Sequence, residues 1–182
     1  MMFPAWDQNL FKLINEWHSH SVDPIMQFLS DKYVWIPLYA FLIWKLFKHN
    51  PKSIKAGVFY LVLTIVWADQ ISSSILKPLV KRLRPSHVPE FQSWIHMPNG
   101  PGGLYGFCSS HAANAFAVAV GFYLLTQNKP MGITLLIWAS LIAYSRIYLG
   151  VHYPLDVITG AVIGTTGAVI LKQFVYDKLV KN

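Results

Sequence analysis

Five apolar segments dominate the pattern of hydrophobic and polar positions, and polar residues gather in the connections between them. The segments are residues 33–47, 54–76, 112–125, 131–149 and 155–174. A helix needs about 20 apolar residues to cross a bilayer, and each segment approaches that length when polar flanking residues snorkel to the interface. The pattern predicts an all-α, polytopic membrane helix bundle with about five or six transmembrane helices between residues 32 and 178.

The first 31 residues follow a different pattern, in which acidic and apolar residues alternate at helical spacing. Asp7 and Asp23 stand among apolar residues such as Leu10 and Phe11. This alternation is typical of amphipathic helices on a membrane surface, and Asp23, as an N-cap before Pro24, would divide the segment into two helices. No basic start or continuous apolar run marks a cleavable signal peptide. From the length of 182 residues we expect one domain over residues 1–182.

Composition indicates where the chain resides. Hydrophobic residues make up 54% of the chain and charged residues 13%, about half the charged share of a soluble domain. A water-exposed globule of this composition could not cover its surface with polar groups, so we expect a membrane protein. Cys108 is the single cysteine, which excludes an internal disulfide framework.

Lysines predict the orientation of the bundle, because they gather in two connections and at the C-terminus. These residues are Lys45, Lys48, Lys52, Lys55, Lys129, Lys172, Lys178 and Lys181. The positive-inside rule places them in the cytoplasm and the acidic N-terminal segment outside. The net charge of +7 then divides into cytoplasmic anchors and an outer cation group, and implies no nucleic-acid partner.

Three polar stretches at ends of the apolar segments carry the candidate chemistry. They are Lys77 with Arg84-Pro85, then Ser109-Ser110-His111, then Ser145-Arg146 with His152 and Asp156. Together they supply three cations, two histidines and one carboxylate. This set can hold a phosphate dianion, attack it and protonate the leaving group. All three stretches fall on the predicted outer side.

The first stretch places two cations on one helix face. Lys77 and Arg84 are seven positions apart, about two helical turns, so both side chains could converge on one phosphate. An alternative is a cluster of interfacial cations that snorkel to lipid headgroups. We retain that alternative only for Lys81 and Arg82.

The second stretch begins the third long apolar segment. Ser109-Ser110 before an alanine-rich run is typical of a helix N-cap, where free backbone N–H groups and the positive end of the helix dipole favour an anion. His111 follows in the first turn. Taken alone, this stretch would favour a capping serine beside an interfacial histidine over an anion site.

The third stretch predicts a tight corner between two helices. Gly150 is placed as the residue after a helix end and Pro154 as the first residue of the next helix. Asp156, four residues after His152, could accept a proton from one imidazole nitrogen and leave the other as a nucleophile. Metal ligation and a simple tie between two helices are the alternatives, and nearby cations disfavour a metal.

The ordered set of spacings Lys-x6-Arg-Pro, Ser-x-His and Ser-Arg-x5-His-x3-Asp resembles the type 2 phosphatidic acid phosphatase family over roughly residues 60–170. The resemblance implies that His152 attacks phosphorus, that Asp156 holds the His152 side chain and that His111 protonates the leaving oxygen. It further implies that Lys77, Arg84, Arg146 and Ser109 bind phosphoryl oxygens with help from the Ser110 N–H. The chain departs from the family's Pro-Ser-Gly-His, with Cys108 at the proline position and Ser110 at the glycine position.

The resemblance implies a membrane lipid phosphatase without a cofactor, acting on the outer face of a bacterial-type inner membrane. Its implied substrates are undecaprenyl pyrophosphate, phosphatidylglycerol phosphate, phosphatidic acid or a lipid A phosphate. A transporter of phosphorylated lipid or anion is the alternative in another class, although a transporter needs no oriented nucleophile. A vanadate-dependent haloperoxidase shares the motif logic but suits a membrane-embedded site poorly.

Three further features have structural or functional interpretations. Asp69 lies in the second apolar segment, where a carboxylate is either functional or paired with a lysine. Gly160, Gly164 and Gly167 form a small-residue face suited to close helix packing. The proline- and glycine-rich loop 86–107 is expected to cover the mouth of the site and to contact lipid.

Overall fold

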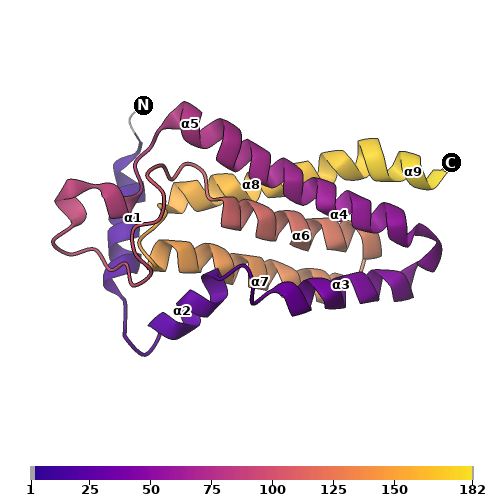
Figure 1. The fold of residues 1–182 in the computed structure, drawn as a ribbon, viewed down its shortest axis with the longest axis horizontal. Helices are drawn as coiled ribbons and strands as arrows, with labels where there is room; N and C mark the ends of the chain where they lie inside the picture. Colours follow the sequence, from indigo (N-terminus) through magenta and orange to yellow (C-terminus); the bar gives the residue numbers. More distant parts are fainter. Residues whose placement is uncertain (1–2, 182) are drawn as a thin grey trace.

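The computed structural model describes residues 3–181 and forms a helical bundle closed at one end by the N-terminal helices and a long loop (Figure 1). Within the described residues, the only β-type pairing is an isolated bridge between Leu83 and Tyr105. The α-helices are α1 (Ala5–Glu16), α2 (Asp23–Ser30), α3 (Ile36–His49), α4 (Ile54–Asp69), α5 (Lys77–Val80), α6 (Ser110–Thr126), α7 (Lys129–Tyr148), α8 (Pro154–Leu171) and α9 (Asp177–Lys181).

All five predicted apolar segments are helical, which confirms the all-α membrane bundle. Among the described residues, three helical runs are long and apolar enough to cross a membrane: Pro51–Val80, Lys129–Tyr148 and Pro154–Lys181. The first run joins α4 to α5 through the π-helical turn Gln70–Leu76, and the last joins α8 to α9 through Lys172–Tyr176. The other two helices, α3 and α6, have 14 and 17 residues.

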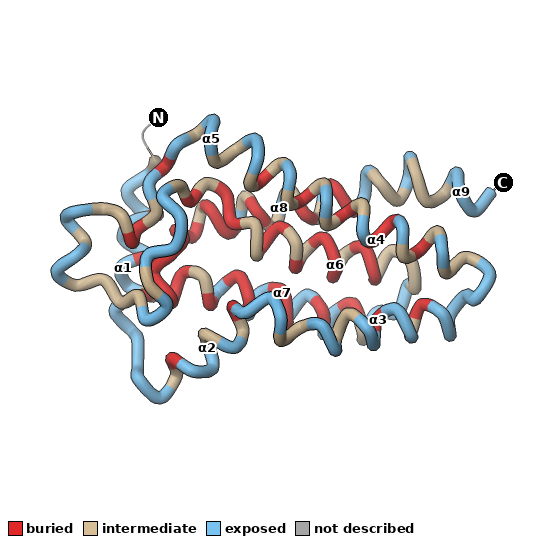
Figure 2. Tube along the Cα trace, viewed as in Figure 1, coloured by how far each residue is buried: buried red, intermediate tan, exposed pale blue. Residues whose placement is uncertain are grey.

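Helix α6 is the centre of the bundle, and the buried residues along it face α4, α7 and α8 (Figure 2). Small residues allow α8 to approach it closely. A Cβ atom added at Gly160 or Gly164 would overlap the carbonyl oxygen of Ser109 or Ala113, respectively. Two glycines of the expected small-residue face therefore pack α8 against α6, and the third, Gly167, packs against Trp67 of α4.

The two N-terminal helices are amphipathic, as the sequence predicts, and their buried faces pack against the bundle. Helix α1 lies across the end of the bundle (Figure 1) and buries Asp7, Phe11 and Asn15. Helix α2 packs along α7. The boundary of α2 differs, because Asp23 is its first residue and Val22 occupies the N-cap position.

The loop over residues 86–107 packs on α1. Phe91 and Trp94 lie against Phe11, with ring centroids 6.1 and 6.0 Å away. These aromatic side chains therefore contribute to the packing of the N-terminal helix. The arrangement gathers α1, α2 and this loop at one end of the bundle, opposite the α3–α4 connection and the C-terminus (Figure 1).

Candidate functional site

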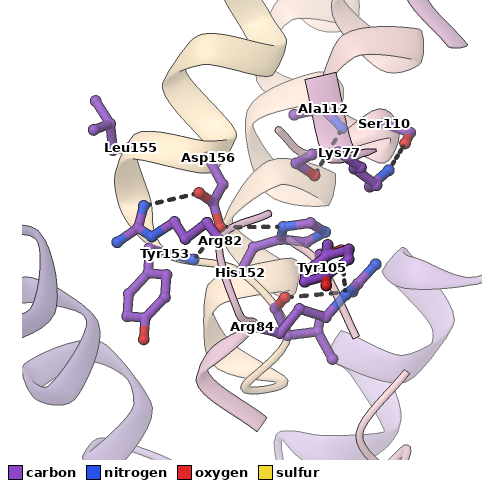
Figure 3. A network of polar contacts seen from close by, with 12 residues as sticks. Lys77, Arg82, Arg84, Tyr105, Ser110, Ala112, His152, Tyr153, Leu155 and Asp156 are labelled. Carbon is purple, nitrogen blue, oxygen red and sulfur yellow. Dashed lines mark hydrogen bonds and ion pairs between the residues drawn. The ribbon is translucent and has the colours of Figure 1, made fainter. Parts of the chain in front are cut away.

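The three polar stretches meet at the end of the bundle that carries α1 and the loop (Figure 3). Lys77 begins α5 and Arg84 follows that helix. Ser110 and His111 begin α6. Arg146 lies in the last turn of α7, His152 in the short connection after it, and Asp156 in the first turn of α8.

The local sequence explains this convergence. Pro85 follows Arg84 and begins a short 3-10 turn, while Gly150 adopts φ 73° just beyond α7. A positive φ suits glycine, so α7 ends there, and Pro154 begins α8 four residues later. The predicted corner is confirmed, and it places His152 and Asp156 side by side.

A cavity of about 310 Å³ opens among these residues. Its lining includes Arg84, Ser110, His111 and His152 from the predicted set. Further lining residues come from the α2–α3 region and from deeper in the bundle: Leu29, Ser30, Asp31, Lys32, Trp35, Tyr39, Asp69, Asn114, Ala115 and Ile142. Both histidines therefore face one cavity, and the end of α2 also borders it.

Lys77 is held by two hydroxyl groups beside this cavity. Its Nζ donates to Ser110 Oγ at 2.5 Å and to Ser73 Oγ at 3.3 Å, and the two hydroxyls lie 2.8 Å apart. Ser73 in turn lies 3.4 Å from Asp69 Oδ1. The serine that replaces the family's glycine therefore uses its side chain to position a cation.

Ser109 has a different environment from Ser110. It is fully buried, its Oγ accepts a hydrogen bond from the Ala112 N–H at 3.4 Å, and its own N–H donates to the Asp156 carbonyl at 2.9 Å. The predicted N-cap is confirmed. The cavity lining does not include Ser109.

Arg84 and Arg146 approach the histidines from two sides. The Arg84 guanidinium donates to the Tyr105 and Val151 carbonyls, each at 3.3 Å. Arg146 donates to the Ser30 hydroxyl, and its backbone carbonyl accepts the His152 N–H at 3.2 Å. Arg146 also lines a second hollow of about 490 Å³, which shares Ser30 with the first cavity. Arg84 therefore lines the cavity that holds the histidines, whereas Arg146 lines the neighbouring hollow.

The His152–Asp156 pair is buried and tightly surrounded. His152 Nδ1 lies 3.5 Å from Asp156 Oδ2, beyond normal hydrogen-bond length, and Nδ1 has no other partner among the residues that the structure describes. Catalytic hydrogen bonds are often long before substrate binds. Burial lowers the pKa of His152 well below its ordinary value, and the positive charges of Arg84 and Arg146 lower it further. The imidazole is therefore neutral at pH 7, as a nucleophile requires.

The sequence analysis missed two charged residues of this site. Arg82, interpreted above as an interfacial cation, is instead only 8% exposed and donates to Asp156 Oδ1 at 2.9 Å. Its other terminal nitrogen lies 2.5 Å from Asp7 Oδ2. That expectation was wrong because a carboxylate 75 positions away pairs with the guanidinium, and no local sequence signal indicates such a pairing.

Cys108 stands close to these groups but does not resemble a second nucleophile. Its side chain is fully buried. Burial raises the pKa of the thiol to about 11, despite the opposing charge of Lys77. The thiol is therefore protonated at neutral pH, and a thiol reacts poorly compared with a thiolate.

Metal ligation of the His152–Asp156 pair lacks further ligands nearby. Within residues 3–181, no three His, Cys, Asp or Glu side chains gather closely enough to hold a metal ion. Cationic groups surround the pair instead, and these favour an anion.

Side chains suited to phosphate chemistry at one end of an apolar helical bundle are typical of membrane phosphatases. The fold and the site together define that class. The chain belongs to the PAP2 superfamily, whose family model matches residues 37–179.

Individual relatives agree with this assignment. A lipid A 4'-phosphatase of Bacteroides thetaiotaomicron is 38% identical over 95% of this chain and 78% of its own length. An undecaprenyl-diphosphatase of Sulfolobus acidocaldarius is 36% identical over 88% of this chain and 74% of its own length. The crystal structure of Aquifex aeolicus LpxE superposes with a TM-score of 0.75 at 28% identity, covering 94% of this chain and 97% of the other. The protein is therefore a membrane phosphatase, and the transporter and haloperoxidase alternatives are set aside.

Proposed function

We propose that this protein removes a phosphate monoester from a lipid A-type glycolipid at the outer face of the cytoplasmic membrane. The observation that carries the proposal is the 38% identity to a lipid A 4'-phosphatase over 95% of the chain. The site is consistent with this chemistry, since two histidines and a cation share one cavity.

In the proposed reaction, His152 attacks phosphorus through its Nε2 atom while Asp156 stabilises the charge that develops on the imidazole. The bond from phosphorus to the leaving oxygen breaks, and His111 gives that oxygen a proton. Water then attacks the phosphohistidine, His111 takes the water's proton, and inorganic phosphate leaves with the His152 imidazole restored.

The cations stabilise the negative charge on the phosphoryl oxygens. Lys77, Arg84 and Arg146 would bind the phosphoryl oxygens, with Ser109 at the helix cap and the N–H of Ser110 at the positive end of α6. Stabilisation of these oxygens is the dominant contribution to phosphoryl transfer. No cofactor enters the reaction.

The deeper part of the cavity favours a sugar over a simple alcohol. Asn114 Oδ1 is buried and has no hydrogen-bond partner within residues 3–181, and Asp69 lines the same cavity. Both are acceptors that a hydroxyl or amide N–H of an acylated sugar could satisfy, and an unsatisfied buried acceptor carries a free-energy cost. The phosphate of a prenyl pyrophosphate brings no such donor.

Charge supports the outward orientation. The lysine-rich α3–α4 connection and the C-terminus lie at the end of the bundle opposite the site. The positive-inside rule would then place the site on the extracytoplasmic side, where lipid that has already been translocated is available.

The test is phosphate release by purified protein from four lipids in detergent micelles: bisphosphorylated lipid A, undecaprenyl pyrophosphate, phosphatidylglycerol phosphate and phosphatidic acid. We expect the highest kcat/KM with lipid A, with mass spectrometry of the product showing loss of one phosphate. The His152→Ala variant supplies the blank. A preference for undecaprenyl pyrophosphate would contradict the substrate while leaving the phosphatase intact.

A further inference from the structure

A buried chain of charges connects the N-terminal helix to the site. Asp7 on α1 accepts from Arg82, and Arg82 donates to Asp156 on α8, at 2.5 and 2.9 Å. Asp7 and Asp156 are both fully buried. The second oxygen of Asp7 accepts the Leu155 N–H at 2.7 Å, in the first turn of α8. One carboxylate on α1 therefore contacts both the partner of Asp156 and the helix that carries Asp156.

The guanidinium has little freedom to move. It lies between two aromatic rings, 3.9 Å from the Phe3 centroid and 3.7 Å from the Tyr153 centroid. These stacking contacts fix the plane of the guanidinium, and its planar fork offers separate N–H donors to the two carboxylates (Figure 3 shows the contact with Asp156). The Arg82 carbonyl also accepts the Gly106 N–H at 2.9 Å, which ties the loop to the same residue.

Stability alone explains this arrangement poorly. Burying charged groups carries a desolvation cost, and well-packed apolar residues commonly give equal or greater stability. A buried charge network beside a nucleophile has a more direct use, because it fixes both the position and the charge of Asp156.

Arg82 and Asp7 have opposite effects on the electrostatic environment of the imidazole. Arg82 alone would neutralise Asp156 and weaken its attraction for the positive charge that forms on His152 during attack. With Asp7 on the far side of the guanidinium, the three groups carry a net charge of −1. That charge lies next to His152 Nδ1, which is 3.5 Å from Asp156, in a buried region where Coulomb interactions are strong.

We propose that Asp7 and Arg82 are positioning residues of the active site. Helix α1 holds the Asp156 carboxylate against His152 through Arg82, and Asp7 offsets the charge of Arg82 so that Asp156 keeps its own for the imidazole. The inference rests on the proposed function of His152 as nucleophile, and it makes the N-terminal helix part of the catalytic apparatus.

The experiment compares Asp7→Asn and Arg82→Lys with Asn15→Ala as matched control. Asn15 is also fully buried on α1 and anchors it through hydrogen bonds to the His96 and Tyr148 carbonyls, each at 2.8 Å, without contacting the charge network. Kinetic constants are measured with bisphosphorylated lipid A and with phosphatidic acid in micelles, together with thermal melting of each purified variant.

We expect Asp7→Asn and Arg82→Lys to lower kcat at least about tenfold while KM changes less than about twofold, because orientation is lost and phosphate binding is retained. Asn15→Ala should lower the melting temperature about as much as Asp7→Asn does, but it should keep kcat within about twofold of wild type. A kcat loss in Asn15→Ala equal to that in Asp7→Asn would reduce α1 to a structural support and overturn the inference.

Two further outcomes keep the test decisive. If Asp7→Asn folds and has wild-type kcat, the inference is overturned. If Asp7→Asn does not fold, a wild-type kcat in Arg82→Lys overturns the inference instead. Failure of the proposed function is distinguishable, because it appears as phosphate release by His152→Ala on both lipids, whatever the α1 variants do.

Discussion

At the scale of the residue, the two histidines differ in their surroundings although both face the same cavity. His152 is buried beside Asp156, with its pKa held well below the ordinary value by burial and two guanidinium groups. His111 stands in the first turn of α6 and has no carboxylate partner in the described part of the chain. This contrast supports the proposal that His152 attacks phosphorus and His111 transfers the proton.

That assignment predicts a different response to the leaving group. The substrate 4-nitrophenyl phosphate has a leaving oxygen that needs no proton, so His111→Ala should still produce a burst of nitrophenolate while its steady-state turnover falls by about 10² to 10⁴. His152→Ala should give no burst, because no phosphoryl acceptor remains. Rapid-mixing absorbance measures both.

The reverse pattern, with a burst in His152→Ala and none in His111→Ala, would exchange the two roles. Melting temperatures of the variants serve as the control for folding.

Some residues of the candidate site could be predicted from the sequence, and others could not. His111, His152, Arg84 and Ser110 could be predicted, because motif spacing and helix ends specify them locally, and the cavity brings these four together. The contact of Arg82 with Asp7 could not, because it joins residues 75 positions apart. Helical periodicity identifies which face of a helix is polar and gives no information on which distant residue meets that face.

At the scale of the element, the approach of α8 to α6 sets the position of Asp156 relative to His111. The two helices touch where glycine removes a side chain, and Gly164 faces the backbone of Ala113 and Ala117. Small residues at such contacts allow backbones to approach closely.

Gly164→Ala should therefore destabilise the protein by about 1–3 kcal/mol, the range for overpacking a filled interior. Thermal melting in detergent measures the change. Gly103→Ala is the matched control, since nothing lies within 4 Å of a Cβ at that position, and its melting temperature should equal that of wild type. Equal melting temperatures for the two variants would contradict the close packing of α6 and α8.

Helix α2, which borders the mouth of the cavity, is anchored by Asp23. Burial alone would raise the pKa of Asp23, but hydrogen bonds from Tyr148 and His96 and the nearby His20 outweigh it, so the pKa is lowered from 3.8. Both hydrogen bonds, to one oxygen, are 2.7 Å long. A carboxylate with a lowered pKa in the folded state stabilises the fold above its unfolded pKa, and this contribution is lost as the pH falls through the folded value.

Asp23→Asn should lower stability at pH 7 by about 2 kcal/mol, the scale of hydrogen bonds to a charged group. The difference from wild type should shrink at a pH below 3.8, where the wild-type carboxylate becomes protonated. Melting curves at both pH values measure this. Glu16→Gln, in an exposed ion pair with Lys12, is the control and should change little. A gap that persists unchanged at low pH would show that the carboxylate charge has no part in anchoring α2.

At the scale of the whole molecule, the sequence predicted the bundle well and its cap poorly. Apolar runs and their interruptions specify the long helices α4, α7 and α8, because lipid requires continuous apolar segments. The packing of α1 across the bundle end depends on buried Asp7 and Asn15. Their partners lie far along the chain, so an amphipathic pattern alone could not distinguish a docked helix from one on a membrane surface.

The orientation of the whole bundle gives a prediction in intact cells. With Cys108 replaced by serine, Asn99→Cys in the site loop should react with a membrane-impermeant maleimide, and Asn128→Cys in the α6–α7 connection should not. Both positions are exposed, so accessibility on each side of the membrane decides the outcome. Labelling after permeabilisation should modify both and serves as the control. The opposite pattern would place the site in the cytoplasm.

The proposed mechanism depends most on a covalent phosphohistidine at position 152, and rapid-quench trapping tests for this intermediate directly. Wild-type protein is mixed with phosphate-labelled lipid A, denatured under alkaline conditions within milliseconds to seconds, and mapped by mass spectrometry of its peptides. We expect a phosphoryl group on His152 that forms before inorganic phosphate appears and is absent from His152→Ala. Phosphate release with no labelled histidine, or with the label on another residue, would contradict it.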